Sequence, residues 1–451
     1  MRRLYGKFRY LVVILGILTM LLVSSGIFAS FMNDNNLQNL EDNPVTLHTS
    51  AENYTWLWNT TWGSGSTDYG FGVAVDAQGF VYCTGMTSFG AGGGDLGLVK
   101  FASNGTRLWS KTWGSSLGTD TGYDMIVDAS GYVYCAANRV NPGTSVDLAL
   151  VKFAPNGTAL WSTFWGGTGL DWGRDVVMDA SGFFYMAGYT TSFGALDEDL
   201  ALVKFSPDGT KLWNTTWGGT GKERGYSVVV DTTGYLYVTG FTNSFGAGGE
   251  DIALVKFAPN GTKLWNITFG GIYNDAGNDI TMDTSGFLYM TGKIYSSITT
   301  HNDVALFKFA PNGTKLWNIT WGSVSSSEEG CAITVDASGN IFVTGKINKF
   351  GATGQDLLVV KFAPNGTYLW NINWGGSGAE DGSAIARSTG GSLYIVGSTS
   401  SLGAGSYDFL LVKVAITSEA GIPGFEFVYL LIGLLALVYM GYRRILFRNT
   451  S

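Results

Sequence analysis

Residues 212–262 read LWNTTWGGTGKERGYSVVVDTTGYLYVTGFTNSFGAGGEDIALVKFAPNGT, and a unit of this kind occurs seven times along the chain. Its Leu-Trp dipeptide places a tryptophan at positions 58, 109, 161, 213, 265, 317 and 370, a spacing of 51 to 53 residues. Self-similarity at a fixed period of this length indicates a repeat architecture. The fold therefore depends on how one unit folds and how neighbouring units meet.

Each unit contains four short runs rich in Val, Tyr, Phe, Trp and Thr, separated by Gly, Pro, Asn and Asp, which is the pattern of strands and turns. In the first copy these runs lie near Gly72–Asp76, Phe80–Gly85, Leu96–Phe101 and Leu108–Trp113. Both faces of the second run are largely apolar, which suits a sheet that is covered on both sides. We therefore expect an all-β fold, a seven-bladed β-propeller of four-stranded antiparallel blades. A solenoid of the same units is the alternative.

The phase of the repeat indicates how the ring closes. The seventh unit supplies only three strands, around Gly382–Arg387, Ser392–Gly397 and Phe409–Val414. The missing fourth strand stands at the start of the repeat region, as Leu57–Trp62. We expect this N-terminal strand to complete the last blade, because closure removes exposed sheet edges.

Hydrophobic membrane segments are expected at both ends of the chain. Four basic residues precede an uncharged run over 10–32, and a second apolar run is followed by three arginines. The positive-inside rule then places the basic ends in the cytoplasm and the propeller outside the cell, at the cell membrane. The first segment fits a cleaved signal peptide or a retained anchor. The alternative for the second is a buried core helix. The expected division of the chain is a signal peptide or N-terminal anchor at 1–33, a linker at 34–55, the propeller at 56–414, a linker at 415–426, a transmembrane segment at 427–442 and a cytoplasmic tail at 443–451.

Composition argues against a nucleic-acid partner and limits the possible disulfide bonds. Only 14% of residues are charged and the net charge is −8, so we expect no nucleic-acid partner, which would require a basic face. The cysteines are Cys83, Cys135 and Cys331, and an odd count leaves at least one free thiol. Cys83 and Cys135 share a repeat position that holds Met, Val or Ile in other copies. They are expected to be buried small side chains, with a disulfide between neighbouring blades as the alternative.

The blocks Trp-Gly-Gly-Thr-Gly, Val-Val-Val-Asp, Tyr-Leu-Tyr-Val-Thr-Gly and Asp-Ile-Ala-Leu-Val-Lys-Phe, as they stand between Trp217 and Phe257, resemble the SBBP β-propeller repeat family. The resemblance extends over about 57–414 and implies a bacterial or archaeal surface or secreted protein, usually without an assigned enzymatic activity. The run Ile422-Pro423-Gly424-Phe425-Glu426 is similar to archaeal sorting signals that are removed by an archaeosortase and replaced by a lipid anchor. A plain transmembrane anchor is the alternative. Arg387 departs from the pattern, because six blades carry an aspartate there.

Several recurring residues have structural interpretations. The aspartate that ends each inner strand precedes a glycine by three positions, as Asp76 precedes Gly79, and this spacing predicts a capped turn. Paired tryptophans such as Trp109 and Trp113 are expected to pack between blades. The lysine before the third-strand phenylalanine recurs in all seven copies and is expected at a blade edge or in a salt bridge.

Two sets of acids are the candidate metal ligands. One acid stands two residues before the glycine that opens each inner strand: Asp68, Asp120, Asp171, Glu223, Asp275, Glu328 and Glu380. A second opens each third strand: Asp95, Asp147, Asp199, Asp251, Asp303, Asp356 and Asp408. Propeller topology would bring both sets to one mouth of the channel. Either each acid bonds to backbone amides, or the first set binds calcium, which takes clustered carboxylate and carbonyl oxygens.

Nine of the Asn-x-Thr sequons are predicted glycosylation sites on the outward-facing protein. They are Asn59, Asn104, Asn156, Asn214, Asn260, Asn266, Asn312, Asn318 and Asn365. The alternative is that Asn-Gly in five of them is a favoured hairpin turn. In either case the motif marks the rim and one face of the ring.

Nothing in the seven copies singles out an enzyme. The chain has two histidines, His48 and His301, so zinc sites and Ser-His-Asp chemistry lack their parts. We expect a non-enzymatic cell-surface binding, adhesion or scaffold module, with an extracellular protein or glycan as ligand and no cofactor other than calcium. The alternative is a propeller-borne extracellular enzyme: a hydrolase, a lyase or a quinone-dependent dehydrogenase. Asymmetry discriminates the two, since catalysis needs one distinctive polar cluster.

Overall fold

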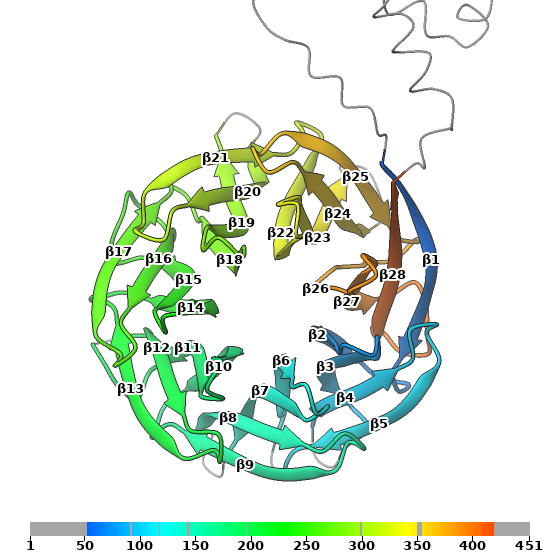
Figure 1. Ribbon diagram of the computed structural model, residues 1–451, viewed down its shortest axis with the longest axis horizontal. Helices are drawn as coiled ribbons and strands as arrows, with labels where there is room; N and C mark the ends of the chain where they lie inside the picture. Colours follow the sequence, from blue (N-terminus) through cyan, green and yellow to red (C-terminus); the bar gives the residue numbers. More distant parts are fainter. Residues whose placement is uncertain are drawn as a thin grey trace, which may run out of the picture. The chain divides into compact units, whose positions relative to one another are not determined.

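The computed structural model describes residues 52–418, with gaps at 91–92, 117, 142–144, 196, 298–299 and 350–353. Within this part of the chain the regular structure consists of 28 strands in seven four-stranded sheets. The sheets stand radially around an open centre (Figure 1). The predicted seven-bladed propeller with antiparallel blades is confirmed. It forms one compact unit over Tyr54–Thr417.

The four strands of each blade run from the channel to the rim. The inner strands are β2 (Tyr69–Val75), β6 (Thr121–Val127), β10 (Asp171–Met178), β14 (Glu223–Val230), β18 (Ala276–Met282), β22 (Ser326–Val335) and β26 (Ala384–Arg387). The second strands are β3 (Val81–Thr87), β7 (Val133–Val140), β11 (Phe184–Thr190), β15 (Leu236–Thr242), β19 (Leu288–Ser296), β23 (Ile341–Lys349) and β27 (Leu393–Thr399). The third strands are β4 (Asp95–Phe101), β8 (Val146–Phe153), β12 (Asp199–Phe205), β16 (Asp251–Phe257), β20 (His301–Phe309), β24 (Gln355–Phe362) and β28 (Asp408–Ser418). The outer strands are β5 (Arg107–Trp113), β9 (Ala159–Trp165), β13 (Lys211–Trp217), β17 (Lys263–Phe269), β21 (Lys315–Trp321), β25 (Tyr368–Trp374) and β1 (Glu52–Trp62).

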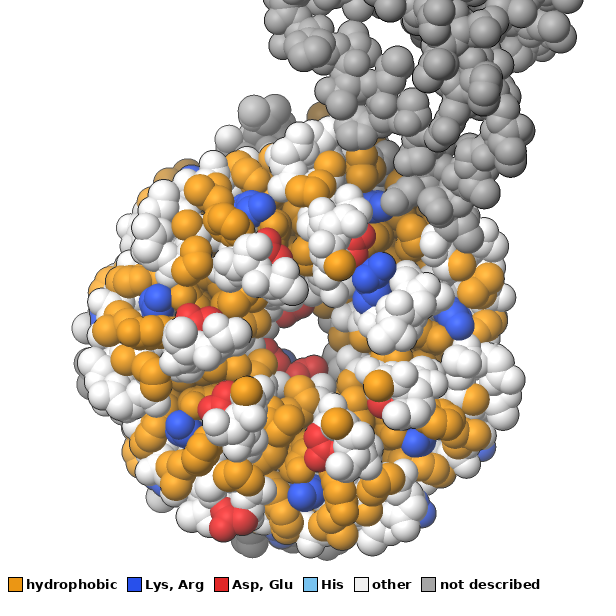
Figure 2. Space-filling model, in the orientation of Figure 1, with side chains coloured by type: hydrophobic (Ala, Val, Ile, Leu, Met, Phe, Trp, Pro, Cys, Tyr) orange, Lys and Arg blue, Asp and Glu red, His pale blue; other side chains and the backbone are white. Residues whose placement is uncertain are grey.

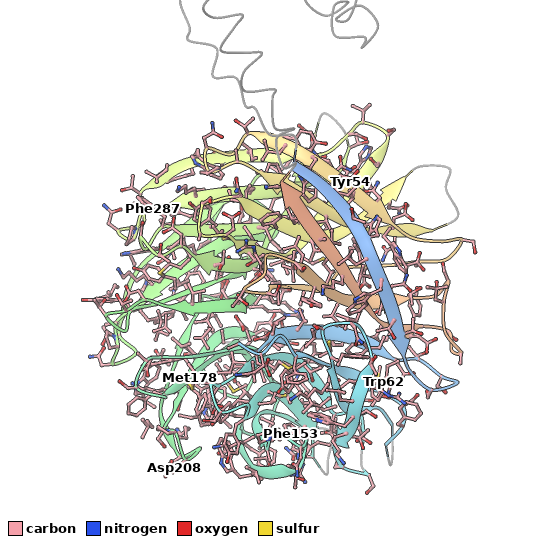
Figure 3. All side chains as sticks on the ribbon, turned by 45° about the vertical axis from the view of Figure 1, so that its right-hand side comes forward. Tyr54, Trp62, Phe153, Met178, Asp208 and Phe287 are labelled. Carbon is pink, nitrogen blue, oxygen red and sulfur yellow. The ribbon has the colours of Figure 1, made fainter. Side chains whose placement is uncertain are left out.

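The seventh blade combines the two ends of the described chain. Its sheet order is β1-β28-β27-β26, so the first strand lies beside the last (Figure 1). Figure 3 shows β1 running along the rim from Tyr54 to Trp62. Trp62 is buried with Phe409 of β28 and with Val81 and Cys83 of the first blade. The first strand thus contributes to the contact between blades seven and one.

The turn after each inner strand is held by its aspartate, as the sequence predicts. Asp76 Oδ1 accepts hydrogen bonds from the backbone N–H of Gln78 (3.0 Å) and Phe80 (2.8 Å), and Tyr82 donates its hydroxyl to Oδ2 (3.1 Å). Gly79 has φ +85°, a conformation that favours glycine. The same turn recurs in five further blades, at Asp128, Asp179, Asp231, Asp283 and Asp336. The aspartate therefore shapes a turn and is not a site residue.

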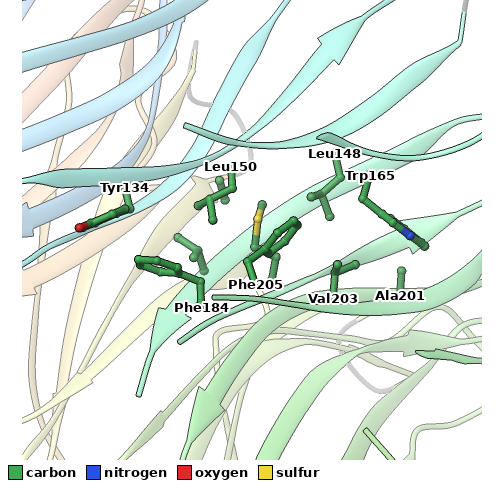
Figure 4. Packing of buried hydrophobic residues seen from close by; sticks show 11 residues of the cluster. Tyr134, Leu148, Leu150, Trp165, Phe184, Ala201, Val203 and Phe205 are labelled. Carbon is green, nitrogen blue, oxygen red and sulfur yellow. The ribbon is translucent and has the colours of Figure 1, made fainter. Parts of the chain in front are cut away.

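The hydrophobic core lies between blades. In the cluster of Figure 4, Tyr134 and Leu148 of the second blade pack against Phe184 and Phe205 of the third. Trp165 is in the same cluster, which confirms the predicted packing role of the tryptophans. Equivalent clusters recur between neighbouring blades around the ring. Each buried side chain of this size stabilises the fold by about 1.5–3 kcal/mol, so the ring depends on blade contacts.

Two further expectations concern the recurring lysines and the cysteines. Lys100 stands over aromatic rings instead of in a salt bridge, with its Nζ 4.2 Å from the ring centre of Phe80. Cys83 and Cys135 are buried and free, so the disulfide between blades is absent and the small-side-chain interpretation holds. Burial raises the pKa of the Cys83 thiol.

The expected signal peptide or anchor at 1–33, the segment at 427–442 and the sorting motif at Ile422–Glu426 lie outside the described residues. Over 52–418, apart from the gaps named above, no helix is long and apolar enough to cross a membrane.

Ring closure by the first strand is tested by truncation. Removing all residues up to Gly63 deletes β1 and exposes β28, because the two strands are neighbours in one sheet. Loss of Trp62 and of the partly buried Trp58 should lower the melting temperature by about 10 °C or more. Differential scanning calorimetry measures the change. A truncation that stops at residue 51 and keeps β1 is the control, and equal melting of the two proteins would refute the pairing.

Candidate active site in the central channel

The inner strands carry a β-bulge next to the channel. In the second blade Gly122 pairs with Ala137 and Asp124 with Ala136, so Tyr123 is the extra residue. The same register shift occurs in five other inner strands, β2, β10, β14, β18 and β22. A bulge re-aims side chains and is frequent beside active sites.

The glycine before the bulge is required by the approach of the preceding blade. A Cβ atom at Gly122 would lie 2.3 Å from the hydroxyl of Thr84 and 2.9 Å from Leu96. These distances leave no room for a side chain. The glycine therefore recurs for packing, and Tyr123 and Asp124 occupy the two positions after it.

Those two positions differ from blade to blade. The first is occupied by Phe71, Tyr123, Arg174, Tyr226, Asn278, Cys331 and Ser383. The second is occupied by Gly72, Asp124, Asp175, Ser227, Asp279, Ala332 and Ala384. All of them except Gly72 line a cavity of about 360 Å³. The polar side chains are concentrated in the second to fifth blades, so the ring is chemically one-sided.

The cavity opens into the visible central channel, where acidic side chains lie on the wall (Figure 2). The acidic row, which we define as Asp124, Asp175, Ser227 and Asp279, runs along one side of it. Each carboxylate in the row also reaches a backbone N–H of the next blade. Val228 N–H donates to Asp175 Oδ2 at 2.6 Å and Ile333 N–H donates to Asp279 Oδ2 at 2.8 Å. The backbone of the neighbouring blade thereby fixes the position of these carboxyl groups.

Ser227 joins two of the carboxyl groups. Its Oγ lies 2.8 Å from Asp175 Oδ2 and 2.7 Å from Asp279 Oδ1. A hydroxyl carries one proton and can donate to only one of these oxygens. For both contacts to be hydrogen bonds, one carboxyl must itself hold a proton and donate it to Ser227. The geometry therefore calls for at least one neutral acid in the row.

The electrostatics agree with this proton count. Burial, together with the charge of Asp175, raises the pKa of Asp279 to about 7, although its hydrogen bonds oppose the rise. Burial raises the pKa of Asp124 well above its ordinary value, and the neighbouring Asp175 adds to the effect through its charge and a shared hydrogen bond. Like charges this close cannot all ionise. The row thus holds protons on some carboxyl groups near neutral pH.

Cationic and aromatic groups complete the cavity wall. Arg174 Cζ lies 4.4 Å from the ring centre of Tyr123 and 5.7 Å from that of Tyr226. On the other side, Glu329 binds Lys346 at 3.1 Å and accepts a hydrogen bond from Asn278 at 2.9 Å. The cavity combines proton donors, carboxylates, a guanidinium and ring faces.

The entry-loop acids lie elsewhere. Asp68 is buried and accepts hydrogen bonds from Ser64 N–H (2.6 Å), Thr87 Oγ1 (2.6 Å) and Ser88 N–H (2.9 Å). Equivalent bonds are made by Asp120, Asp171, Glu223, Asp275, Glu328 and Glu380. Each acid thus anchors the loop of its own blade, and none of the fourteen predicted acids lines the cavity.

The third-strand acids lie close to the entry-loop acids. A Cβ at Gly114 would meet Asp95 Oδ1 at 1.8 Å and Asp120 Oδ2 at 2.8 Å, so both carboxylates approach one glycine. Within the part of the chain that is described, no three acidic, histidine or cysteine side chains are grouped as metal ligands. Calcium binding by the entry-loop acids stays a prediction.

The sequon asparagines lie on the outside of the ring. Eight are exposed and Asn266 is half-buried. Asn104 Oδ1 accepts a hydrogen bond from Thr106 N–H (3.0 Å), which shows that the hairpin uses this side chain.

Mass spectrometry of the native protein should find glycans on the exposed asparagines, and bare sequons throughout would contradict the outside location.

The residues of the acidic row and Arg174 were missed in the sequence. They occupy two positions that differ between copies, whereas the search for a site followed residues that recur. The available signal was the alignment of the seven copies, position by position, after the inner-strand glycine. It would have separated the second to fifth blades from the others.

A family model for the SBBP β-propeller repeat matches residues 61–90, which span the end of β1 and all of β2 and β3. A search of the curated proteins finds no match. Among solved structures, the chain is similar to the periplasmic gluconolactonase of Pseudomonas aeruginosa, with 13% identity, 70% of this chain and 91% of that chain covered, and a TM-score of 0.49. It is also similar to a gluconolactonase of Xanthomonas campestris, with 13% identity, coverage of 81% and 90%, and a TM-score of 0.40. Neither likeness gives a substrate for this chain.

The expectation of a non-enzymatic binding, adhesion or scaffold module was wrong. The solved propellers to which the chain is similar are described as enzymes. The premise behind the expectation also fails, because the seven copies are not alike where they face the channel. The physical reason is that packing fixes the blade interiors and leaves the bulge positions free to diverge.

The raised pKa of Asp279 predicts a pH dependence of stability. A carboxyl whose pKa is raised on folding stabilises the fold when protonated, and this stabilisation is lost between the unfolded pKa, about 4, and the folded value of about 7. Asp279→Asn keeps the shape but cannot titrate. From pH 5 to pH 8 the melting temperature of the wild type should therefore fall more steeply than that of the variant.

Asp208→Asn is the matched control for this measurement. Asp208 is exposed in a hairpin where five other blades carry asparagine. Its neighbours lower its pKa, so its contribution has the opposite sign. Thermal melts of Asp279→Asn and wild type with parallel slopes would show that Asp279 does not hold a proton.

Proposed function

We propose that the protein is a hydrolase that uses the acidic row of the central channel as paired acid and base. The observation that carries the proposal is the contact of Ser227 Oγ with both Asp175 and Asp279, at 2.8 and 2.7 Å. The Ser227 hydroxyl thus bridges two carboxyl groups, of which one, Asp279, is proposed to hold a proton, and the other, Asp175, accepts hydrogen bonds. A proton donor and a base held this close can catalyse hydrolysis by general acid–base catalysis.

The two carboxyl groups have different roles. Asp279, whose pKa lies at about 7, is the acid that gives a proton to the leaving oxygen of the substrate. Asp175 accepts hydrogen bonds from Val228 N–H and from Ser227, which hold it as the base that activates water. Environments that separate the protonation states of neighbouring carboxyl groups are how acid and base roles are assigned at neutral pH.

The size and lining of the cavity support a small polar substrate. A volume of about 360 Å³ lies at the lower end of the range of ligand pockets. Tyr123, Tyr226, Asn278 and Ser383 place hydroxyl and amide groups in the lining of the cavity. This mixture suits a polyhydroxylated molecule of about one sugar ring, with an ester, lactone or glycosidic bond to cleave. Among the enzyme classes considered, the paired carboxyl groups support a hydrolase, because they can activate water and protonate the leaving oxygen within one cavity.

The proposal is tested by turnover assays on the full chain with aryl glycosides, sugar lactones and aryl esters between pH 5 and pH 9. We expect hydrolysis in one of the three series, with kcat/KM falling above about pH 7 as Asp279 loses its proton. Asp279→Asn and Asp175→Asn should each reduce kcat by about 100-fold or more, the usual contribution of general acid–base catalysis.

Asp208→Asn should leave turnover unchanged, since this residue is exposed in an outer hairpin. Circular dichroism and melting curves confirm that each variant is folded. Turnover in none of the three substrate series, or full activity in both channel variants, would overturn the proposal.

A further inference from the structure

Arg174 lines the cavity but is not part of the acidic row. It occupies the repeat position of Tyr123 and Tyr226, between those two rings. Its Cζ also lies 5.5 Å from the ring centre of Trp172. Stacking on aromatic faces holds a guanidinium in place while leaving its edge available for hydrogen bonds.

The edge of this guanidinium is not fully satisfied by the protein. Arg174 Nε is buried and has no hydrogen-bond partner in the structure, and the same is true of Nε1 of the adjacent Trp172. Arg174 forms no salt bridge with any acid among the described residues. A buried donor without an acceptor is costly, so each such group calls for an explanation.

Arg224 of the next blade provides an internal comparison. It stands over Tyr189, with Cζ 4.5 Å from the ring centre, much as Arg174 stands over Tyr123. Arg224 binds Glu198 through two contacts, Nε to Oε2 at 2.5 Å and Nη2 to Oε1 at 2.8 Å. The fold thus supplies a carboxylate fork to Arg224, whereas Arg174 lines the cavity and belongs to none of the salt bridges of the described residues.

We propose that Arg174 is an anion subsite that binds a carboxylate carried by the substrate, so that the substrate class is a sugar acid or a derivative of one. The proposal rests on the proposed function for the position of the reacting bond, but the subsite is defined by Arg174 and the rings around it. Arginine matches a carboxylate with two parallel hydrogen bonds, as Arg224 does with Glu198.

The surroundings favour a ligand over an internal partner. The acids of the row are engaged with Ser227 and with backbone N–H groups of the next blade, as in the bonds of Asp175 and Asp279. The cavity beside Arg174 has room for a sugar-sized molecule. Tyr123 and Tyr226 flank the guanidinium and hold it at the cavity wall.

The binding test separates this subsite from catalysis by using the full chain with the Asp279→Asn substitution, which removes the proposed proton donor. Glucuronate and glucose are the matched probes, because they differ by a carboxylate at one carbon. Isothermal titration calorimetry at pH 6.5 should show glucuronate binding at least about 10-fold more tightly than glucose. Arg174→Gln added to this background should bring the two affinities within about 2-fold of each other.

Arg174→Lys and inorganic anions refine the result. Lysine keeps the charge but loses the fork, so it should retain only part of the preference. Sodium acetate and sodium sulfate at constant ionic strength test whether the subsite selects carboxylate or any oxyanion, read from tryptophan fluorescence near Trp172. Binding of acetate that is saturable and lost in Arg174→Gln supports the proposal, whereas saturable binding of sulfate without binding of acetate would overturn the assignment of a carboxylate.

Two outcomes would overturn an anion subsite of any kind at Arg174. One is equal binding of glucuronate and glucose together with no saturable response to acetate or sulfate. The other is a preference for glucuronate that persists in Arg174→Gln. If Arg174→Gln loses the preference for glucuronate over glucose while the wild-type chain hydrolyses none of the substrates, the subsite is supported and the hydrolase proposal is refuted.

Discussion

The structure depends on one constraint: each blade buries both faces of its sheet only against its two neighbours. The clusters that bridge consecutive blades contain almost all of the large buried side chains, such as Tyr134 with Phe184. A blade has no core of its own, so no blade can be stable without the ring. This requirement explains why the packing residues recur with so little change. It also explains why β1 lies in the same sheet as the three strands of the last repeat.

The same constraint explains where the repeat is allowed to vary. Side chains between blades are fixed by two neighbours, and the inner-strand glycine is fixed by the blade before it, as at Gly122. The bulge residues point into the channel, where no neighbouring sheet fills the space. The residue in the bulge therefore differs from blade to blade, as between Phe71, Arg174 and Asn278, while the ring stays the same. In this fold we expect functional residues at the positions where packing between blades does not fix the residue type.

The sequence predicts the structural features that recur in every repeat, and it does not predict the candidate site, whose residues differ between repeats. Strand positions, the Asp76 turn and the packing of tryptophans follow from patterns that occur in nearly every copy. The entry-loop acids were correctly seen as recurrent, but recurrence itself indicates a structural role, as the bonds of Asp68 show. The candidate site could not be derived from a consensus, because Arg174 and Ser227 each occur once at their position. Their contacts across a spacing of 52 residues become visible only in three dimensions.

The charges of the channel can be understood together. Arg174 lines the same cavity as Asp175 and Asp279, and the pKa of Asp279 is raised by burial and by the charge of Asp175. An anionic substrate bound at Arg174 would neutralise the guanidinium and add negative charge to a partly desolvated cavity. A like charge nearby favours the protonated form of a carboxyl. Substrate binding would thus keep the proton on Asp279, which couples occupancy of the anion subsite to the readiness of the proposed acid.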